Sequence, residues 1–303
     1  MCVEGSGVFV CVCVCVCVCV CVCLCLCLCS HSLRSCVCVY VRMSNFLLNL
    51  DSLKFSKSFD EVEQVSGRTP CPRCGNLRRY YCYDCVLPIG HVPPRPAARL
   101  PVAFHIVRHI AEKPSKSSII PLKLVYPQDV FLYTFTQSKL ASEDGRIEPE
   151  FPRDFDWKNT AILFPTHDAE SVASLSEVAD ADASSPQGDE PVERINIIVI
   201  DSSWSTALQV LKRHPQLRLV SKKVKLSSKN ETIFWRHQNI DRSCLATCEA
   251  VYVFLREYTA GSYNGEFDDV MFYYVFVHRL ITNFYQQTKK HRGHLPTYTI
   301  SQQ

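Results

Sequence analysis

The feature that most constrains the fold is the apolar run "INIIVI" at residues 195–200, which stops at Asp201 in "DSSWSTA". Bulky aliphatic residues without alternation are typical of a strand that is covered on both faces, as in a parallel sheet. Parallel strands need long crossover connections, and strand-like runs alternate with helical patterns along this chain. We therefore predict an α/β fold, with a parallel sheet and flanking helices.

The other elements are expected before and after this run along the chain. Further strand-like runs lie at 102–107, 123–126, 129–135 and 160–164, and apolar residues at helical spacing predict helices at 243–258 and 267–290. Residues 171–194 are acidic and poor in large apolar groups, so we expect a disordered insertion there. Residues 141–200 carry 14 acidic and 4 basic side chains, which leaves a basic surplus on both flanks. That surplus suits a phosphate-rich partner, but ordinary solubility explains it equally well.

The first 42 residues are a low-complexity Cys/Val repeat, with ten cysteines alternating from Cys11 to Cys29. A TG dinucleotide repeat encodes this pattern, so we interpret residues 1–42 as a non-native extension and Met43 as the natural start. The alternatives are a membrane anchor or a signal peptide, although no cleavage-site pattern is present. If the repeat is not native, we expect no membrane partner. Residues 43–66 come next as a flexible lead-in.

A second motif lies at residues 67–96, where two CxxC pairs are separated by seven residues. Four thiolates at this spacing predict a tetrahedral Zn²⁺ site, formed by Cys71, Cys74, Cys82 and Cys85. The zinc is expected to be structural, because four protein ligands leave no open position for chemistry. Between the pairs, Arg78 and Arg79 with their aromatic neighbours suit RNA contact or a solvated face about equally. Two disulfides are disfavoured, since the distribution of cysteines indicates a reducing compartment.

Asp201 is the first candidate for chemistry, because ligands of α/β sheets bind beyond the carboxyl ends of the strands. A simpler interpretation is that Asp201 and the serines after it cap a helix. A similar junction comes after the strand-like run at 160–164, and a third joins "FWRHQ" at 234–238 to "LATCEA" at 245–250. In the third, Glu249 lies on an otherwise apolar helix and needs a partner, for which Arg236 is a candidate.

These motifs, "IDSSW", "FWRHQ" and "LATCEA", come after the paired cysteines that end in "YCYDC". In this order, over about residues 67–290, they resemble the DTW-domain family of tRNA-uridine aminocarboxypropyltransferases. The resemblance implies a catalytic domain at 97–291, a tail at 292–303, and a fold similar to the knotted SPOUT methyltransferases. The family motif is Asp-x-Thr-Trp, whereas this chain has Ser203 at the threonine position. Serine keeps the hydroxyl group, so we expect function to survive.

The resemblance also implies an activity. Members of the family transfer the 3-amino-3-carboxypropyl group of S-adenosylmethionine to N3 of uridine, which gives 3-(3-amino-3-carboxypropyl)uridine at D-loop position 20 of tRNA. The expected partners are therefore tRNA and S-adenosylmethionine. The alternatives are a SPOUT-like methyltransferase and a non-catalytic, zinc-containing RNA-binding module. The resemblance favours the nucleus over the cytoplasm, and the sequence leaves the oligomeric state and the choice of tRNA open.

This hypothesis gives roles to individual residues. Asp201 is the expected general base, Ser203 would hold Asp201 or the cofactor, and Trp204 would stack on a base or close the pocket. Arg236 would bind a carboxylate or phosphate, and Glu249 would hold the ammonium of the migrating group or pair with Arg236. The expected cofactor-binding set is Phe164, Pro165, Thr166, Ile200, Ser202, Arg236, Leu245, Thr247 and Glu249. The expected RNA contacts, beside Arg78 and Arg79, are Lys222, Lys223, Lys225, Arg242, Lys289, Lys290 and Arg292.

Overall fold

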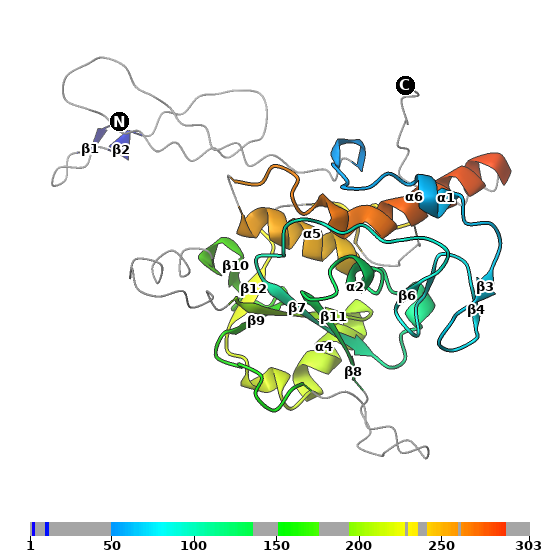
Figure 1. Cartoon of the computed structure of the whole chain (residues 1–303). Coiled ribbons are helices and arrows are strands. Elements are labelled where there is room, and N and C mark those ends of the chain that lie inside the picture. The colour runs from blue at the N-terminus through cyan, green and yellow to red at the C-terminus, as the bar shows by residue number, and fades with distance from the viewer. Residues whose placement is uncertain are drawn as a thin grey trace, which may run out of the picture. The chain divides into compact units, whose positions relative to one another are not determined.

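The computed structural model describes residues 2–3, 10–11, 50–135, 151–175, 194–227, 230–235, 241–259 and 262–288. The chain divides into two units, Met1–Phe46 and Leu47–Gln303. In the first unit, β1 (Cys2–Val3) pairs antiparallel with β2 (Val10–Cys11). The second unit contains the sheet and the longer helices, all of which are labelled in Figure 1.

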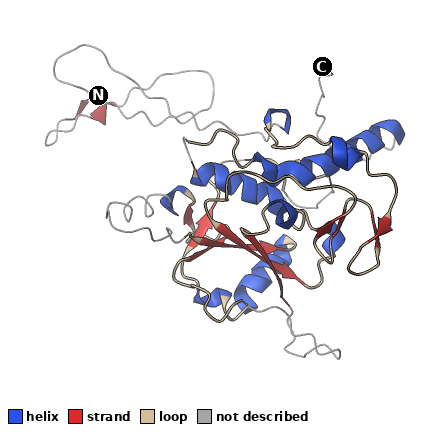
Figure 2. Ribbon diagram, in the orientation of Figure 1, coloured by secondary structure: helices blue, strands red, loops and turns tan. Residues whose placement is uncertain are grey.

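The centre of the second unit is a six-stranded sheet in which all neighbouring strands run parallel (Figure 2). Its strands are β7 (Ala103–His109), β8 (Val130–Phe135), β9 (Thr160–Leu163), β10 (Glu170–Ser171), β11 (Asn196–Asp201) and β12 (Lys223–Lys225). Their order across the sheet is β10-β12-β9-β11-β7-β8. The apolar run at 195–200 is thus a central strand, β11, which explains why its apolar residues do not alternate with polar ones.

Helices cover both faces of the sheet (Figure 1). On one face, α4 (Trp204–Arg213) packs Ala207, Val210 and Leu211 against side chains of β7, β9 and β11. On the other face, α5 (Thr247–Tyr258) brings the ring of Phe254 to 5.5 Å from that of Phe104, between centroids. The 3-10 helix η4 (Asp268–Met271) and α6 (Phe272–Thr288) complete this layer. The α/β prediction is confirmed, as are the two helices expected at 243–258 and 267–290.

Residues 50–65 differ from the flexible lead-in that we expected. They contain η1 (Leu50–Ser52) and α1 (Asp60–Glu63). The backbone N–H of Lys54 donates to Asp268 Oδ2 at 2.7 Å, and the ring of Phe59 lies 4.7 Å from that of Phe272. Both contacts reach η4 and α6, so a segment that is polar in sequence is held by the C-terminal helices.

The cysteine motif forms two small antiparallel hairpins. They pair β3 (Thr69–Pro70) with β4 (Leu77–Arg78) and β5 (Tyr81–Cys82) with β6 (Leu87–Pro88). Just after β6, Nε2 of His91 accepts a hydrogen bond from the hydroxyl of Tyr273 at 2.7 Å. We refer to residues 67–96 as the knuckle, and this contact joins its end to α6.

Two short elements were predicted wrongly or missed. Residues 123–126 are not a strand. Residues 123–125 belong to helix α2 (Leu122–Val125), which comes after η2 (Pro114–Lys116), and Tyr126 is the C-cap of α2. Pro121 precedes α2 with helical dihedral angles, and the buried Leu122 and Val125 lie three residues apart, as on one helix face. The edge strand β10, its neighbour β12 and the 3-10 helix η3 (Leu217–Leu219) were not anticipated.

Two further expectations concern parts of the chain with no described structure. Most of the predicted disordered insertion, residues 176–193, lies outside the described residues, as does the tail at 292–303. Within the described ranges, none of the helices has the length and apolar character needed to cross a bilayer.

Candidate active site at the carboxyl edge of the sheet

The strand order creates a switch point at the carboxyl edge. β8 lies on one side of β7, whereas β9 lies on the other side, with β11 between them. Connections that leave neighbouring strands in opposite directions open a crevice at their carboxyl ends, where α/β proteins bind ligands. Asp201 ends β11 at this point and is in register with Arg108 of β7. The structure therefore places Asp201 where the sequence predicted a site.

Asp201 is nearly enclosed and is held by two hydroxyl groups. Ser117 donates to Asp201 Oδ2 at 2.7 Å, and Thr247 donates to Oδ1 at 2.7 Å. Only 7% of Asp201 is exposed. Burial raises the pKa of Asp201, while the Ser117 and Thr247 hydroxyls oppose that rise. One carboxylate thus joins three segments, namely the β7–α2 connection, β11 and the start of α5.

Ser203 makes contacts other than the one expected with Asp201. It is the N-cap residue of α4, its Oγ donates to Thr206 Oγ1 at 2.8 Å, and its backbone N–H donates to Glu112 Oε1 at 3.1 Å. Glu112 comes from the β7–α2 connection, as does Ser117. The signature serine is exposed. Through Glu112 it contacts the same connection that holds Asp201.

Trp204 and the loop after β9 lie side by side. The ring centroids of Trp204 and Phe164 are 6.0 Å apart, and 37% of Trp204 is exposed. Pro165 comes directly after Phe164, and the backbone N–H of Thr166 donates to the Phe164 carbonyl at 2.8 Å, which makes a tight turn. An exposed aromatic face beside this turn can accept a flat ligand.

Polar groups without partners lie close to Asp201 in the sequence and the sheet. Ser202 Oγ and Arg108 Nη1 are buried and, among the described residues, neither has a hydrogen-bond partner. Arg108 Nη2 donates to Thr134 Oγ1 at 3.3 Å, so the other end of the guanidinium is held in place. Buried polar atoms are nearly always satisfied in folded proteins. At the ends of adjacent strands, an unpaired donor and an unpaired hydroxyl are thus available to a polar ligand or an ordered water.

The other expected cofactor residues differ in their access to this edge. Thr247 contacts Asp201 directly, Leu245 is half-buried just before α5, and Ile200 is buried in the core that packs under α4. Arg236 lies outside the described residues.

Glu249 is fully buried and has four donors of its own chain. They are the backbone N–H groups of Ala246 and Ile233 and the hydroxyls of Thr232 and Tyr274, at 2.6–2.8 Å. Burial raises the pKa of Glu249, and these donors oppose the rise. The carboxylate closes the first turn of α5 and joins it to residues 232–233 and to α6. Its expected contact with an ammonium group or Arg236 would have to compete with these bonds.

The four cysteines of the knuckle converge as a metal site requires. Their sulfur atoms all lie within 4.8 Å of one another, and Cys74 Sγ is 3.7 Å from Cys82 Sγ. Four thiolates at about 2.3 Å from one zinc ion would be about 3.8 Å apart, so the cluster fits tetrahedral Zn²⁺. The pKa of the Cys71 thiol is lowered to about 7, mainly by a hydrogen bond from the backbone N–H of Cys74. The lower pKa favours the thiolate, which is the form that binds metal.

The expected RNA-contact residues lie in three different places. Arg78 pairs with Asp84 at 2.5 Å and stands 4.1 Å above the ring of Tyr83, and Arg79 donates to the Val65 carbonyl at 3.2 Å. Lys222, Lys223 and Lys225 lie at or next to β12, and Arg242 forms an ion pair with Glu231. Lys223 pairs with Asp168 at 3.0 Å. Lys289, Lys290 and Arg292 lie outside the described residues.

Three residues of the edge, Arg108, Glu112 and Ser117, were not predicted from the sequence. All three lie at the end of β7 or in the connection after it. Polar residues directly after a buried strand are a usable signal for such positions, and this signal is also present at the end of β7.

Comparisons with known proteins identify the family of the chain. A family model described as "DTW domain" matches residues 79–282. The chain is 29% identical to tRNA-uridine aminocarboxypropyltransferase 1 of Xenopus laevis, covering 79% of this chain and 88% of that protein. It is 30% identical to the Mus musculus protein of the same name, covering 73% of this chain and 79% of that protein. It is 28% identical to the Homo sapiens protein of the same name, covering 77% of this chain and 83% of that protein. No solved structure matches. The family match spans the carboxyl edge and most of the sheet, and the chain belongs to the DTW domain family.

Proposed function

We propose that this protein is a tRNA-modifying transferase that moves the 3-amino-3-carboxypropyl group of S-adenosylmethionine to N3 of a uridine in the tRNA D-loop, at position 20. The relatives are named tRNA-uridine aminocarboxypropyltransferase 1 and cover most of the chain. The structural observation that carries the proposal is the enclosed Asp201 beside the unpaired Ser202 Oγ and Arg108 Nη1. Together they make a built polar site at the switch point of the sheet.

S-adenosylmethionine fits the chemistry of this edge. We propose that it lies against the turn at 164–166, the end of β11 and the start of α5. The Arg108 guanidinium is suited to its carboxylate, and Ser202 to a second polar group. When bound, S-adenosylmethionine would supply an electrophilic carbon next to its sulfonium centre, and breaking of that carbon–sulfur bond would release the rest of the cofactor as a neutral thioether. The exposed face of Trp204 would stack on the adenine or on the uracil.

The chain's own task is to remove the proton from uridine N3. The proton would reach Asp201 through the hydroxyls that hydrogen-bond to it, because the carboxylate itself is nearly buried. We propose that Ser117 or Thr247 accepts the N3 proton at its oxygen while its own hydrogen passes to Asp201. A carboxylate with a raised pKa is a better acceptor for that hydrogen. Glu112 and Ser203 would keep the loop around this relay in place.

Three further proposals rest on the same family. Strand β11 enters between β7 and β9, which supports threading of the knotted SPOUT type. The four cysteines hold a structural zinc ion. The protein acts in the nucleus, which a fluorescent fusion beginning at Met43 would test by its distribution in living cells.

The experiment that tests the activity is nucleoside mass spectrometry. The purified protein is incubated with unmodified tRNA and S-adenosylmethionine labelled in its aminocarboxypropyl part. We expect label in a modified uridine that maps to the D-loop. In a parallel reaction, the S-adenosylmethionine is labelled in its methyl group instead. Label that enters the RNA only in this second reaction would assign a methyltransferase, and binding of tRNA without any product would assign a non-catalytic RNA-binding module. Asp201→Asn is the matched inactive control.

A further inference from the structure

A groove lies between the knuckle and α2, at the amino edge of the sheet. It has a volume of about 610 Å³, and its lining combines apolar side chains with the cations Arg95, Arg99 and Lys123. Cys85 of the metal cluster also lines it, so the knuckle forms one of its walls. The carboxyl edge with Asp201 is at the other end of the strands. The groove is therefore a separate feature from the candidate active site.

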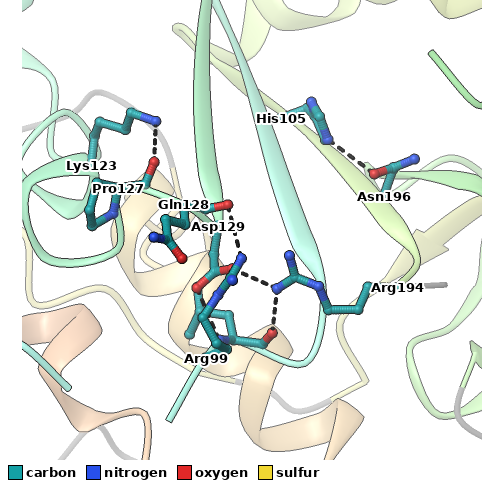
Figure 3. Close-up of polar contacts among 9 residues, drawn as sticks. Arg99, His105, Lys123, Pro127, Gln128, Asp129, Arg194 and Asn196 are labelled. Atoms are coloured by element: carbon teal, nitrogen blue, oxygen red, sulfur yellow. Dashed lines mark hydrogen bonds and ion pairs between the residues drawn. The ribbon is translucent and has the colours of Figure 1, made fainter. Parts of the chain in front are cut away.

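A buried carboxylate positions two arginines at this edge (Figure 3). Asp129 Oδ1 accepts from Arg99 Nη2 and from Arg194 Nη1, each at 2.5 Å. The Asp129 side chain is 2% exposed, whereas those of Arg99 and Arg194 are 53% and 34% exposed. Two guanidinium groups on one carboxylate leave one positive charge in excess, with N–H donors still free to face an anion.

Two more cations extend the positive surface. Lys123 Nζ donates to the Pro127 carbonyl at 2.6 Å and stands 5.0 Å from the ring centre of Phe131, so it is held without an acidic partner. Within the described part of the chain, neither Arg95 nor Lys123 has a carboxylate at ion-pair distance. A groove with a net positive lining attracts anions, and the effect is strongest at low salt.

The walls of the groove are rigid before any ligand binds. Pro88, Pro93, Pro96 and Pro127 line it, and proline rings fix the backbone. Val86, which also lines it, has a φ of 54°, a conformation that a β-branched residue adopts only when its surroundings enforce it. A preformed groove loses little conformational entropy on binding.

We propose that this groove binds a segment of the phosphodiester backbone of the tRNA substrate. The proposal rests on the proposed function for the identity of the RNA. Phosphates match the surplus charge, and the proline walls suit ribose and base faces. An acidic peptide fits the groove less well. Its carboxylates would contact only the cations, whereas a sugar-phosphate chain would contact the guanidinium groups through its phosphates and the apolar walls through its sugars and bases.

One connection of the chain reaches both the groove and the candidate active site. The connection from Ser117 to Asp129 contacts Asp201 at its start, through Ser117, and forms a wall of the groove at its end. Next to Ser117, the Ser118 hydroxyl accepts from the backbone N–H of Cys248 in α5 at 3.2 Å. RNA bound in the groove would therefore lie against the same connection that contacts the proposed proton acceptor at its start.

The test is a binding measurement on the full chain. Fluorescence anisotropy with labelled tRNA would be recorded for the wild-type protein and for Arg95→Ala/Lys123→Ala, across a series of salt concentrations. We expect the Kd of the double variant to rise on the order of tenfold, and the salt slope to fall by about 1 for each lost phosphate contact. The charge-matched control is Lys158→Ala/Arg218→Ala, which removes two exposed cations outside the groove and should bind like the wild type.

The possible results separate this inference from the proposed function. A Kd and salt slope that equal those of the wild type, in a variant with an unchanged melting temperature, would overturn it. It would equally fail if a polyglutamate peptide bound at the groove with tRNA binding unaffected by the two substitutions. Asp201→Asn should abolish transfer but leave tRNA binding intact. If no aminocarboxypropyl product forms and the groove variants still weaken tRNA binding, the proposed function is wrong and the groove assignment stands.

Discussion

Thr247, the first residue of α5, donates its hydroxyl hydrogen to Asp201, the last residue of β11, at 2.7 Å. The N-terminus of a helix carries a partial positive charge, which favours a carboxylate at this position. Because Ser117 occupies the other oxygen, the orientation of Asp201 is set from both sides. The carboxylate therefore has a defined geometry in spite of its burial.

Removing one of these hydroxyls should reduce activity more than stability. For Thr247→Val we expect transfer, measured as kcat/KM, to fall at least about tenfold, with a loss of roughly 1 kcal/mol in unfolding free energy. Thr259→Val is the matched control, since Thr259 makes a similar bond to the Leu255 carbonyl at the far end of α5. Equal losses of activity in both variants would contradict a role for the Asp201 contact.

The serine of the signature should be replaceable by the family's threonine. Ser203 acts through its hydroxyl toward Thr206 and its backbone N–H toward Glu112, and threonine keeps both. We expect Ser203→Thr to retain transfer within about twofold, whereas Ser203→Ala should lose more, because the hydroxyl bond is removed. A threonine variant that is less active than the alanine variant would show that the extra methyl group is what matters.

Glu249 should be essential for stability. Its two oxygens accept four hydrogen bonds, and Gln would turn one oxygen into a donor that faces other donors. We expect Glu249→Gln to lower the unfolding free energy by about 3 kcal/mol in urea titration. Glu61→Gln, at an exposed ion pair with Lys57, should leave it nearly unchanged, because solvent screens that pair.

The buried His105 predicts a loss of stability in acid. Burial lowers its pKa to about 4, from an ordinary value of 6.5. Between pH 6.5 and 4 this histidine is protonated in the unfolded chain but stays neutral in the folded chain. The free energy of unfolding therefore falls as pH drops from 6.5 toward 4. The loss reaches up to about 3 kcal/mol. Urea midpoints across this window should depend less on pH in His105→Gln, while the exposed His167→Gln should keep the wild-type profile.

Zinc removal should loosen the knuckle and its contacts with α6. Elemental analysis should find one zinc ion per chain, and Cys82→Ser should contain less, because Cys82 is fully buried in the cluster. We expect a lower melting temperature, since the knuckle reaches α6 through Tyr80 and Phe276, whose rings are 4.9 Å apart. Cys244→Ser, outside the cluster, serves as control, and a Cys82→Ser protein with full zinc content would argue against the site.

The parallel sheet was predictable because β11 has strong local signals, an unbroken apolar run and a polar stop. The four residues at 123–126 were not, because so short an apolar run fits a strand and a helix face equally well. β12 was not predicted, since it is only three residues long and its two lysines, Lys223 and Lys225, flank a single buried valine.

The site was predictable only in part. Asp201 could be found from its place after β11, but its partner Ser117 is 84 residues away along the chain. No spacing rule connects them, because the contact depends on how the β7–α2 connection folds back over the sheet.

The central position of β11 also has a consequence for how the chain is made. Its two neighbours, β7 and β9, both precede it in the sequence, so the nascent chain carries an open gap until Asp201 has been synthesised. Until then, the apolar edges of both strands are free to pair with other chains. The sheet can therefore close only after both neighbours of its middle strand have been made.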